Sequence, residues 1–370
     1  MLADLSDARF TQAEVHHALE ALDRRGLRPL REHRTPERIL AWIDAEFGGA
    51  WSSEAAAGGI WIAEDAVGPV GFAAYDPHGL PYHWLRAWRQ RPSVGIFGPF
   101  GVAQRARGTG LGRDLLHAAL FSLRERGYRQ ALIPVVNEGI VAYYERHAGA
   151  RAVENVDPGR RGRRWRATVL ASGNGSNFEG VLAASGTGRV PLEVAALIVN
   201  RPRARVLERA ATANVPAEVV VWERSVELRE AYDARVLAAV AATEPELVLM
   251  LGWMHVLPPP FIARFPELLN LHPAFLPLDP AVETVTMPDG TSLAAFRGVH
   301  AFDDALAAGK GWAGATVHRV SVAVDRGEVL ARAPLALAAA EPRTELEARL
   351  HALERDVVGT GVRRWSWEQR

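Results

Sequence analysis

The chain has no cysteine, and Lys310 is the only lysine among its 370 residues. Without cysteine, disulfide bonds, thiolate zinc sites and a cysteine nucleophile are excluded. A mechanism through a lysine Schiff base is also disfavoured. No apolar run approaches the roughly 20 residues of a membrane span, and Asp4 and Asp7 interrupt the start of the chain. We therefore expect a cytoplasmic enzyme that is neither exported nor inserted into a membrane.

Neither sign of charge is in excess, because 43 Lys and Arg residues balance 43 Asp and Glu residues. This balance disfavours nucleic acid and membrane surfaces as partners, and small-molecule substrates are expected. A chain of 370 residues is long for a single hydrophobic core. Residues 157–165 are rich in Pro, Gly and Arg and lack periodicity. They predict a linker between two domains, at 1–160 and 161–370.

The first domain contains a glycine-rich stretch, RGTGLG, from Arg107 to Gly112. A predicted strand, 94–102, precedes it, and an amphipathic helix follows. Backbone N–H groups of such a loop can hold an anion, to which the helix dipole adds about 0.3–1 kcal/mol. A flexible turn is the alternative interpretation. Around this stretch the pattern predicts helices at 11–25 and 36–47 and strands at 59–63 and 70–75.

The arrangement Arg107-x-x-Gly110-x-Gly112 after an apolar strand resembles the pyrophosphate loop of GNAT-family N-acetyltransferases. The resemblance implies a mixed sheet with helices that binds acetyl-CoA. It also implies that Tyr144 is the acid, although Tyr144 lies one residue farther from the next glycine than in the family pattern. Packing of Tyr143 and Tyr144 between a helix and the sheet is the alternative. The CoA contacts implied are Val102, Arg107, Gly108, Gly110, Gly112, Asn137 and Tyr144.

The second domain begins with a predicted strand, 165–171, the loop SGNGSN at 172–177 and a helix from Phe178. Glycines at a helix start suit a monophosphate, whereas the third glycine of a dinucleotide fingerprint is absent. Strands then alternate with helices, which predicts a doubly wound, mainly parallel Rossmann-like sheet. Ligands of such sheets lie at the carboxyl ends of strands, where Ser172, Gly252 and His272 fall. The expected strands are 192–198, 217–221 and 247–251, and the expected helices are 203–213 and 225–241.

Asn270 and His272 end a short apolar strand, 267–271, and prolines follow. Residues two apart on a strand share a face, so an amide and an imidazole would share one pocket. An amide can stabilise an oxyanion and an imidazole can transfer protons, while a capped turn is the alternative. Asp325 follows a strand expected at 313–324 and precedes another at 329–333. It would orient His272 if the fold brings the two together, and otherwise it is a turn residue.

The ordered motifs SGNGSN, NLHPAFLP and Asp-x-Gly together resemble the glycinamide ribonucleotide formyltransferase family across residues 166–358. The resemblance implies transfer of a formyl group from 10-formyltetrahydrofolate to the amine of glycinamide ribonucleotide, in purine biosynthesis and without a metal. It implies that Asn270, His272 and Asp325 are catalytic. The substrate contacts implied are Gly175, Ser176, Asn177 and Glu354, and the folate contacts are Arg229, Met254, His255, Leu257 and Val324.

Several features depart from that family's pattern, namely His255, Ala274, His351 and an apparent insertion at 279–295. Thr344-x-x-Glu347 is a predicted capping box that opens a final helix. An amino sugar nucleotide or an aminoacyl-tRNA is the alternative formyl acceptor. The first domain could instead be a regulatory module that binds CoA without turnover. Its acyl acceptor, the coupling between domains and the oligomeric state, a homodimer included, stay open.

Overall fold

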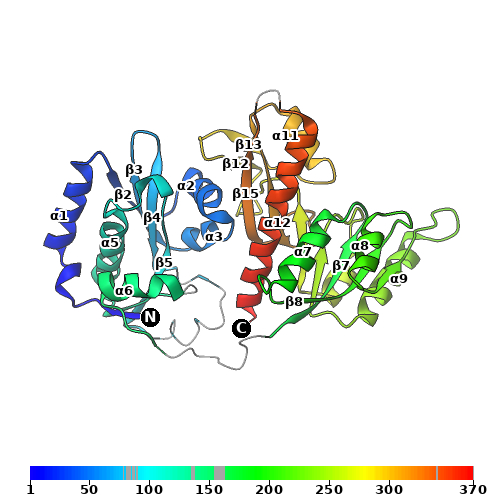
Figure 1. The fold of residues 1–370 in the computed structure, drawn as a ribbon, viewed down its shortest axis with the longest axis horizontal. Helices are drawn as coiled ribbons and strands as arrows, with labels where there is room; N and C mark the ends of the chain where they lie inside the picture. The colour runs from blue at the N-terminus through cyan, green and yellow to red at the C-terminus, as the bar shows by residue number, and fades with distance from the viewer. Residues whose placement is uncertain are drawn as a thin grey trace. The chain divides into compact units, whose positions relative to one another are not determined.

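The protein is described here by a computed structural model that covers residues 1–77, 79–80, 85, 88, 91–134, 138–153, 163–338 and 341–369. The chain divides into two compact units (Figure 1). Most of the expected linker, 157–165, lies outside the described residues. No helix in the described part of the chain has the length and apolar character needed to cross a bilayer. Unit 1 comprises Met1–Phe47, Trp51–Arg160 and Trp367–Arg370, and unit 2 comprises Gly48–Ala50 and Arg161–Ser366.

Unit 1 contains a six-stranded sheet in the order β1-β6-β5-β4-β3-β2. The pair β5–β6 is parallel and the other pairs are antiparallel, which confirms the expected mixed sheet. Helices α1 and α5 cover one face, and α2 and α3 cover the other (Figure 1). The strands are β1 (Leu2–Asp4), β2 (Arg28–Glu32), β3 (Gly59–Glu64), β4 (Pro69–Tyr75), β5 (Val94–Val102) and β6 (Gln130–Leu132). The helices are α1 (Gln12–Asp23), α2 (Glu37–Ile43), α3 (Trp51–Ala56), α5 (Leu111–Glu125) and α6 (Val141–Ala148).

Helix α5 is held to the sheet by the apolar face that the sequence pattern predicts. Leu111, Leu115, Ala119 and Leu123 follow one another at intervals of four residues and are fully buried in the core of unit 1. Burying each leucine contributes roughly 1.5–3 kcal/mol. The start of α5, with Gly110, is thereby fixed close to the end of β5.

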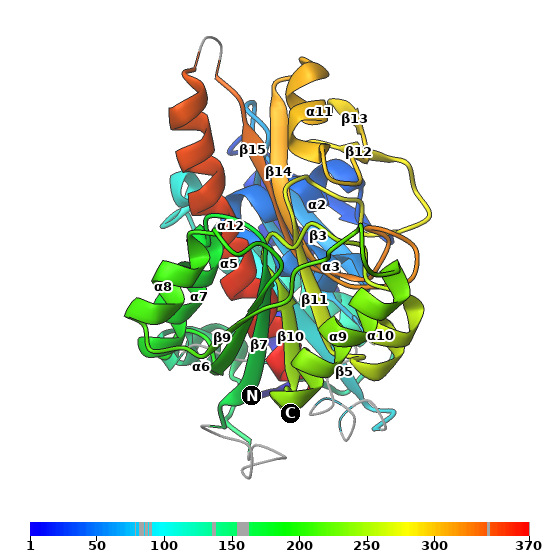
Figure 2. The ribbon, with the colours of Figure 1, turned by 90° about the vertical axis from the view of Figure 1, so that its right-hand side faces the viewer.

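Unit 2 contains a seven-stranded sheet in the order β15-β14-β11-β10-β7-β8-β9. The strands from β11 to β9 are parallel, and β14 and β15 are antiparallel additions. Helices α7, α8 and α12 pack on one face and α9 and α10 on the other (Figure 2), which confirms the doubly wound sheet. The strands are β7 (Trp165–Ala171), β8 (Leu192–Val199), β9 (Ala217–Val219), β10 (Leu247–Met250), β11 (Leu268–His272), β14 (Trp312–Arg319) and β15 (Val329–Ala336). The helices are α7 (Ser176–Gly186), α8 (Val206–Thr212), α9 (Arg229–Ala242), α10 (Pro259–Arg264), α11 (Ala301–Ala307) and α12 (Arg343–Glu368).

The structure corrects several boundaries expected in unit 2: α8 starts at Val206 rather than 203, α9 starts at Arg229 rather than 225, and β9 ends at Val219 rather than 221. Strand β14 ends at Arg319 rather than at residue 324, and its pairing with β15 has a bulge at Val317/His318. Helix α7 starts two residues before Phe178, because Gly175 adopts a left-handed conformation just ahead of it. Helix α12 starts at Arg343, and the N–H groups of Glu345 and Leu346 donate to the Pro342 carbonyl, so Thr344 is inside the helix and is not its N-cap.

Candidate active site

A cavity of about 350 Å³ opens in unit 2 beyond the carboxyl ends of β7, β10 and β11. The loop after β7, the loop after β10, the end of β11 and α12 all contribute to it. Loops 298–299 and 320–325 close another side. Predicted site residues that line it are Gly175, Ser176, Asn177, Met254, His255, Leu257, Asn270, His272, Val324, Asp325 and Glu354. Parallel strands bring these distant segments together because their carboxyl ends meet at one edge of the sheet.

His272 is held by two partners that fix both of its ring nitrogens. Its Nε2 lies 2.8 Å from the carbonyl oxygen of Phe296, which can only accept a hydrogen bond, so Nε2 carries a proton and donates it. Its Nδ1 lies 3.5 Å from Oδ2 of Asp325. The Nδ1 edge beside Asp325 is therefore the edge that can gain and lose a proton.

Asn270 pairs with a histidine that the sequence analysis did not single out. The amide Nδ2 of Asn270 lies 3.2 Å from Nε2 of His318, and Nδ1 of His318 donates to the Arg319 carbonyl at 2.8 Å. Nε2 of His318 therefore faces both the Asn270 amide and Oδ1 of Asp325, which lies 3.5 Å away. Asn270 and His318 are opposite each other in the antiparallel pair β11–β14. The only sequence signal was a histidine within an apolar strand.

Asp325 lies between His272 and His318 and carries the negative charge among these side chains. Its Oδ2 accepts a hydrogen bond from the Gly298 N–H at 2.7 Å, and its Oδ1 lies 3.5 Å from Nε2 of His318. Burial on its own would raise the pKa of Asp325, but the His318 ring, the charge of His272 and the Gly298 N–H together lower that pKa to about 2. The carboxylate is thus ionised near neutral pH.

Burial dominates the titration of His272. Desolvation lowers the pKa of His272 below its ordinary value, more strongly than Asp325 and the Phe296 carbonyl raise it. His318 and Arg297 also act to lower it. At neutral pH the imidazole is consequently uncharged and able to accept a proton.

The loop from Gly175 to Asn177 lines one side of the cavity, at the start of α7. Gly175 has φ +79° at the start of α7, and a Cβ there would lie 2.5 Å from Cγ2 of Val206, so no other residue fits. Nδ2 of Asn177 donates to Oε2 of Glu354 at 2.8 Å. The buried Oδ1 of Asn177 has no hydrogen-bond partner among the described residues. One polar atom is therefore left available beside Glu354.

Glu354 and His351 reach the same cavity from α12. Burial raises the pKa of Glu354, while Asn177 and His351 oppose that change.

The resemblance to formyltransferases implies a set of folate contacts, and most of these residues lie in the loop after β10, which forms one wall of the cavity. Nδ1 of His255 lies 3.0 Å from the Tyr232 hydroxyl, and burial is the main cause that lowers the His255 pKa. Arg229 does not line the cavity. Its guanidinium donates to Asp233 at 2.8 Å and to the carbonyl of Val256, a lining residue, at 2.6 Å.

Unit 1 contains the predicted CoA loop. Gly108 and Gly110 have φ +78° and +86°, and Nε of Arg107 donates to the Val102 carbonyl at 3.2 Å. A Cβ on Gly112 would lie 3.0 Å from the Tyr143 hydroxyl. The predicted contact Asn137 lies outside the described residues.

The two tyrosines of α6 differ in their surroundings. Tyr144 is buried in the core of unit 1, and its pKa is strongly raised by burial. The buried hydroxyl of Tyr143 has no partner within the described residues and lies next to the glycine loop. Desolvation, followed by the charge of Asp114, raises the pKa of Tyr143 to about 12. Tyr143 is thus the tyrosine beside the loop, which the sequence analysis had treated only as a packing residue.

Comparison with known proteins identifies both units. Residues 165–288 and 289–360 match the Formyl transferase family, and residues 56–147 match the Acetyltransferase (GNAT) domain. Phosphoribosylglycinamide formyltransferase of Mycobacterium tuberculosis (strain ATCC 25618 / H37Rv) is 37% identical over 198 residues, which are 53% of this chain and 83% of the relative. The Escherichia coli (strain K12) enzyme of that name is 30% identical over 187 residues, which are 50% of this chain and 80% of the relative.

A similar solved structure is glycinamide ribonucleotide transformylase 1 from Symbiobacterium toebii, with 31% identity and a TM-score of 0.47. The match covers 54% of this chain and 86% of that chain. The two segments that match the Formyl transferase family together span more than half of the 370 residues. The chain therefore belongs to the formyl transferase family, and it also carries a GNAT acetyltransferase domain.

Proposed function

We propose that unit 2 transfers the formyl group of 10-formyltetrahydrofolate to the amine of glycinamide ribonucleotide, a step of purine biosynthesis. One observation carries the proposal: Asn270, His272 and Asp325 line the same cavity as a glycine loop at a helix start. This transfer requires an oxyanion donor, a proton carrier and a site for the phosphate of the acceptor, and a helix start can provide that site. Relatives that bear the name phosphoribosylglycinamide formyltransferase support the same acceptor.

The co-substrate supplies the formyl carbon that the amine attacks. One N–H of the Asn270 amide is bonded to His318, so the second N–H is free to donate to the oxyanion that forms. His272 takes a proton from the attacking amine at Nδ1, because its Nε2 is already bonded to Phe296. The Asp325 carboxylate, 3.5 Å away, stabilises the resulting imidazolium. His272 then returns the proton to the departing folate nitrogen.

Glycinamide ribonucleotide would lie between the glycine loop and α12. Backbone N–H groups at the start of an α-helix have no intrahelical acceptor, so those of Ser176 and Asn177 can donate to the phosphate. The unpartnered Oδ1 of Asn177 and the carboxyl group of Glu354 can accept hydrogen bonds from ribose hydroxyl groups. The folate would contact the wall formed by Met254, His255, Leu257 and Val324, with Arg229 behind it.

The decisive assay follows tetrahydrofolate release by the purified chain with glycinamide ribonucleotide and the formyl donor. We expect turnover with this acceptor. A Ser176→Ala/Asn177→Ala double variant keeps the backbone N–H groups but removes the Ser176 hydroxyl beside the phosphate and the Asn177 Oδ1 beside the ribose, so it should raise the KM about 10-fold or more. An exposed double variant, Thr212→Ala/Ser225→Ala, is the matched control. Turnover only with an amino sugar nucleotide or an aminoacyl-tRNA would replace the acceptor.

We also propose that unit 1 binds acetyl-CoA through the loop from Arg107 to Gly112. The left-handed glycines and the GNAT match support this assignment. Titration calorimetry with acetyl-CoA tests it, and CoA release with candidate amines separates an acetyltransferase from a module that only binds. Absence of heat with acetyl-CoA would refute the assignment.

A further inference from the structure

Residues 279–295, the apparent insertion, fold into a hairpin that contacts the loops around His272. Strands β12 (Thr284–Thr286) and β13 (Ser292–Ala294) pair in antiparallel register. Val285, Met287 and Leu293 are buried, and Oδ2 of Asp289 accepts a hydrogen bond from Nε1 of Trp312 on β14 at 2.9 Å. The hairpin is therefore attached to the sheet of unit 2 at its tip.

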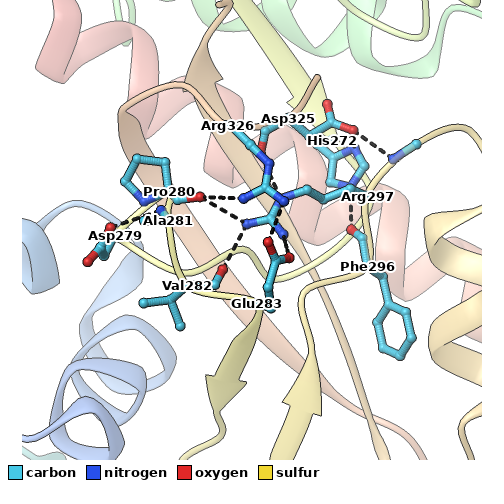
Figure 3. Close-up of polar contacts among 11 residues, drawn as sticks. His272, Asp279, Pro280, Ala281, Val282, Glu283, Phe296, Arg297, Asp325 and Arg326 are labelled. Carbon is cyan, nitrogen blue, oxygen red and sulfur yellow. Dashed lines mark hydrogen bonds and ion pairs between the residues drawn. The ribbon is translucent and has the colours of Figure 1, made fainter. Parts of the chain in front are cut away.

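Three consecutive residues after the hairpin hold the catalytic pair. Phe296 accepts the hydrogen bond of His272 Nε2, and Gly298 donates to Oδ2 of Asp325. Between them, Nε of Arg297 donates to the backbone carbonyl of Asp325 at 3.3 Å. The position of this segment therefore sets the position of both His272 and Asp325 (Figure 3).

Glu283 joins this segment to the loop that carries Asp325. One of its carboxylate oxygens lies 2.6 Å from Nη1 of Arg297, and the other accepts a hydrogen bond from Nη2 of Arg326, the residue after Asp325 (Figure 3). Nη1 of Arg326 also donates to the Pro280 carbonyl at 2.8 Å, and Nη2 of Arg297 donates to the Val282 carbonyl at 3.0 Å. Both arginine side chains are therefore hydrogen-bonded to residues at the start of the hairpin.

We propose that Glu283 is a positioning residue for formyl transfer, because it connects Arg297 and Arg326 and so holds the two loops that orient His272 and Asp325. This inference rests on the function proposed above. Glu283, Arg297 and Arg326 do not line the cavity, so their effect on the reaction is indirect. Glu283 also neutralises the Arg297 charge, which otherwise disfavours protonation of His272.

The charged and titratable groups around His272 determine the direction of the expected pH effect. Asp325 favours the imidazolium, whereas Arg297 and His318 disfavour it. His351 and Glu354 face the same cavity from α12. A Glu283→Gln substitution leaves Arg297 and Arg326 without their shared carboxylate, so His272 should titrate at a lower pH than in the wild-type protein.

The experiment compares wild-type, Glu283→Gln and Arg326→Gln chains in steady-state formyl transfer across pH. We expect kcat to fall about 10-fold or more, because a displacement of 1 Å can cost about 10²-fold, with KM values unchanged. The acid limb of the profile should move to lower pH in Glu283→Gln. Because both variants break one bridge, the double variant should lose no more than the worse single variant. Glu193→Gln, which breaks an exposed ion pair with Arg166 at the start of β8, is the control that should keep wild-type kcat.

Titration of labelled His272 by NMR is the second readout, and it does not depend on turnover. A lower His272 pKa in full-length Glu283→Gln than in wild type supports the inference even if glycinamide ribonucleotide is not formylated, in which case only the proposed acceptor fails. An unchanged His272 titration together with unchanged kcat would overturn the inference. Lower kcat with an unchanged titration and additive losses in the double variant would also overturn it, since that pattern indicates only general destabilisation.

Discussion

Replacing Asp325 by Asn removes one charge and leaves the backbone unstrained. Asp325 has φ +53°, a left-handed conformation that Asn tolerates as well as Asp does, whereas Ala would add strain. The amide oxygen of Asn can still accept the hydrogen bond of Gly298. The substitution therefore isolates the interaction of the carboxylate with His272 and His318.

The pKa of Asp325 gives the free energy of folding that its ionised carboxylate contributes. A fall from 3.8 to about 2 corresponds to about 2 kcal/mol of stability at neutral pH. Because the folded-state pKa is the lower one, this stability is present above pH 3.8 and is lost as the pH falls through about 2. Asn resembles the protonated acid, so Asp325→Asn should be less stable than wild type by about 2 kcal/mol at pH 7, with the difference vanishing near pH 2.

Activity should fall more steeply than stability. Without the carboxylate, the imidazolium of His272 loses its stabilising charge, and kcat should drop about 10²–10⁴-fold. The acid limb of the kcat profile should also move to lower pH, since Asp325 raises the His272 pKa.

Urea unfolding at several pH values and steady-state formyl transfer measure the two effects. Asp356→Asn, an exposed change in the middle of α12, is the control and should match wild type in both. A stability difference between wild type and Asp325→Asn that stays constant from pH 7 to pH 2 would refute the electrostatic argument. Wild-type kcat in Asp325→Asn would refute the proposed role in proton transfer.

Three other substitutions test separate parts of the molecule. Asn270→Ala should lower kcat about 10²–10³-fold with little change in KM, and an unchanged kcat would exclude Asn270 as the oxyanion donor. Glu354→Gln should raise the free energy of unfolding at pH 7, because a folded-state pKa above the ordinary value penalises the ionised carboxyl group, and this gain should disappear below pH 4.5. The same variant should bind glycinamide ribonucleotide more weakly in calorimetry. Gly110→Ala places a side chain at φ +86°, which costs about 1 kcal/mol, and should weaken acetyl-CoA binding without affecting formyl transfer.

Much of the fold follows from local sequence pattern. The strands 94–102 and 165–171 occur at their predicted bounds, because their apolar residues and flanking glycines are signals within a short segment. The predicted apolar face of α5 is the buried one. The predicted boundaries were wrong where tertiary packing overrode the local sequence pattern. One example is β14, which ends at Arg319, five residues before residue 324, ahead of the loop that contains Asp325.

The sequence by itself determined the order of the motifs, the loops at which glycine is required and the residue types of the candidate site, since all of these depend on near neighbours in the chain. Only the tertiary structure decided which side chains meet. The register of β11 with β14 places His318 against Asn270, and the hairpin at 279–295 brings Glu283 to the arginines beside Asp325. Such pairs are separated by many residues along the chain, so their contacts depend on strand order and packing. A pattern within a short segment of sequence does not predict either.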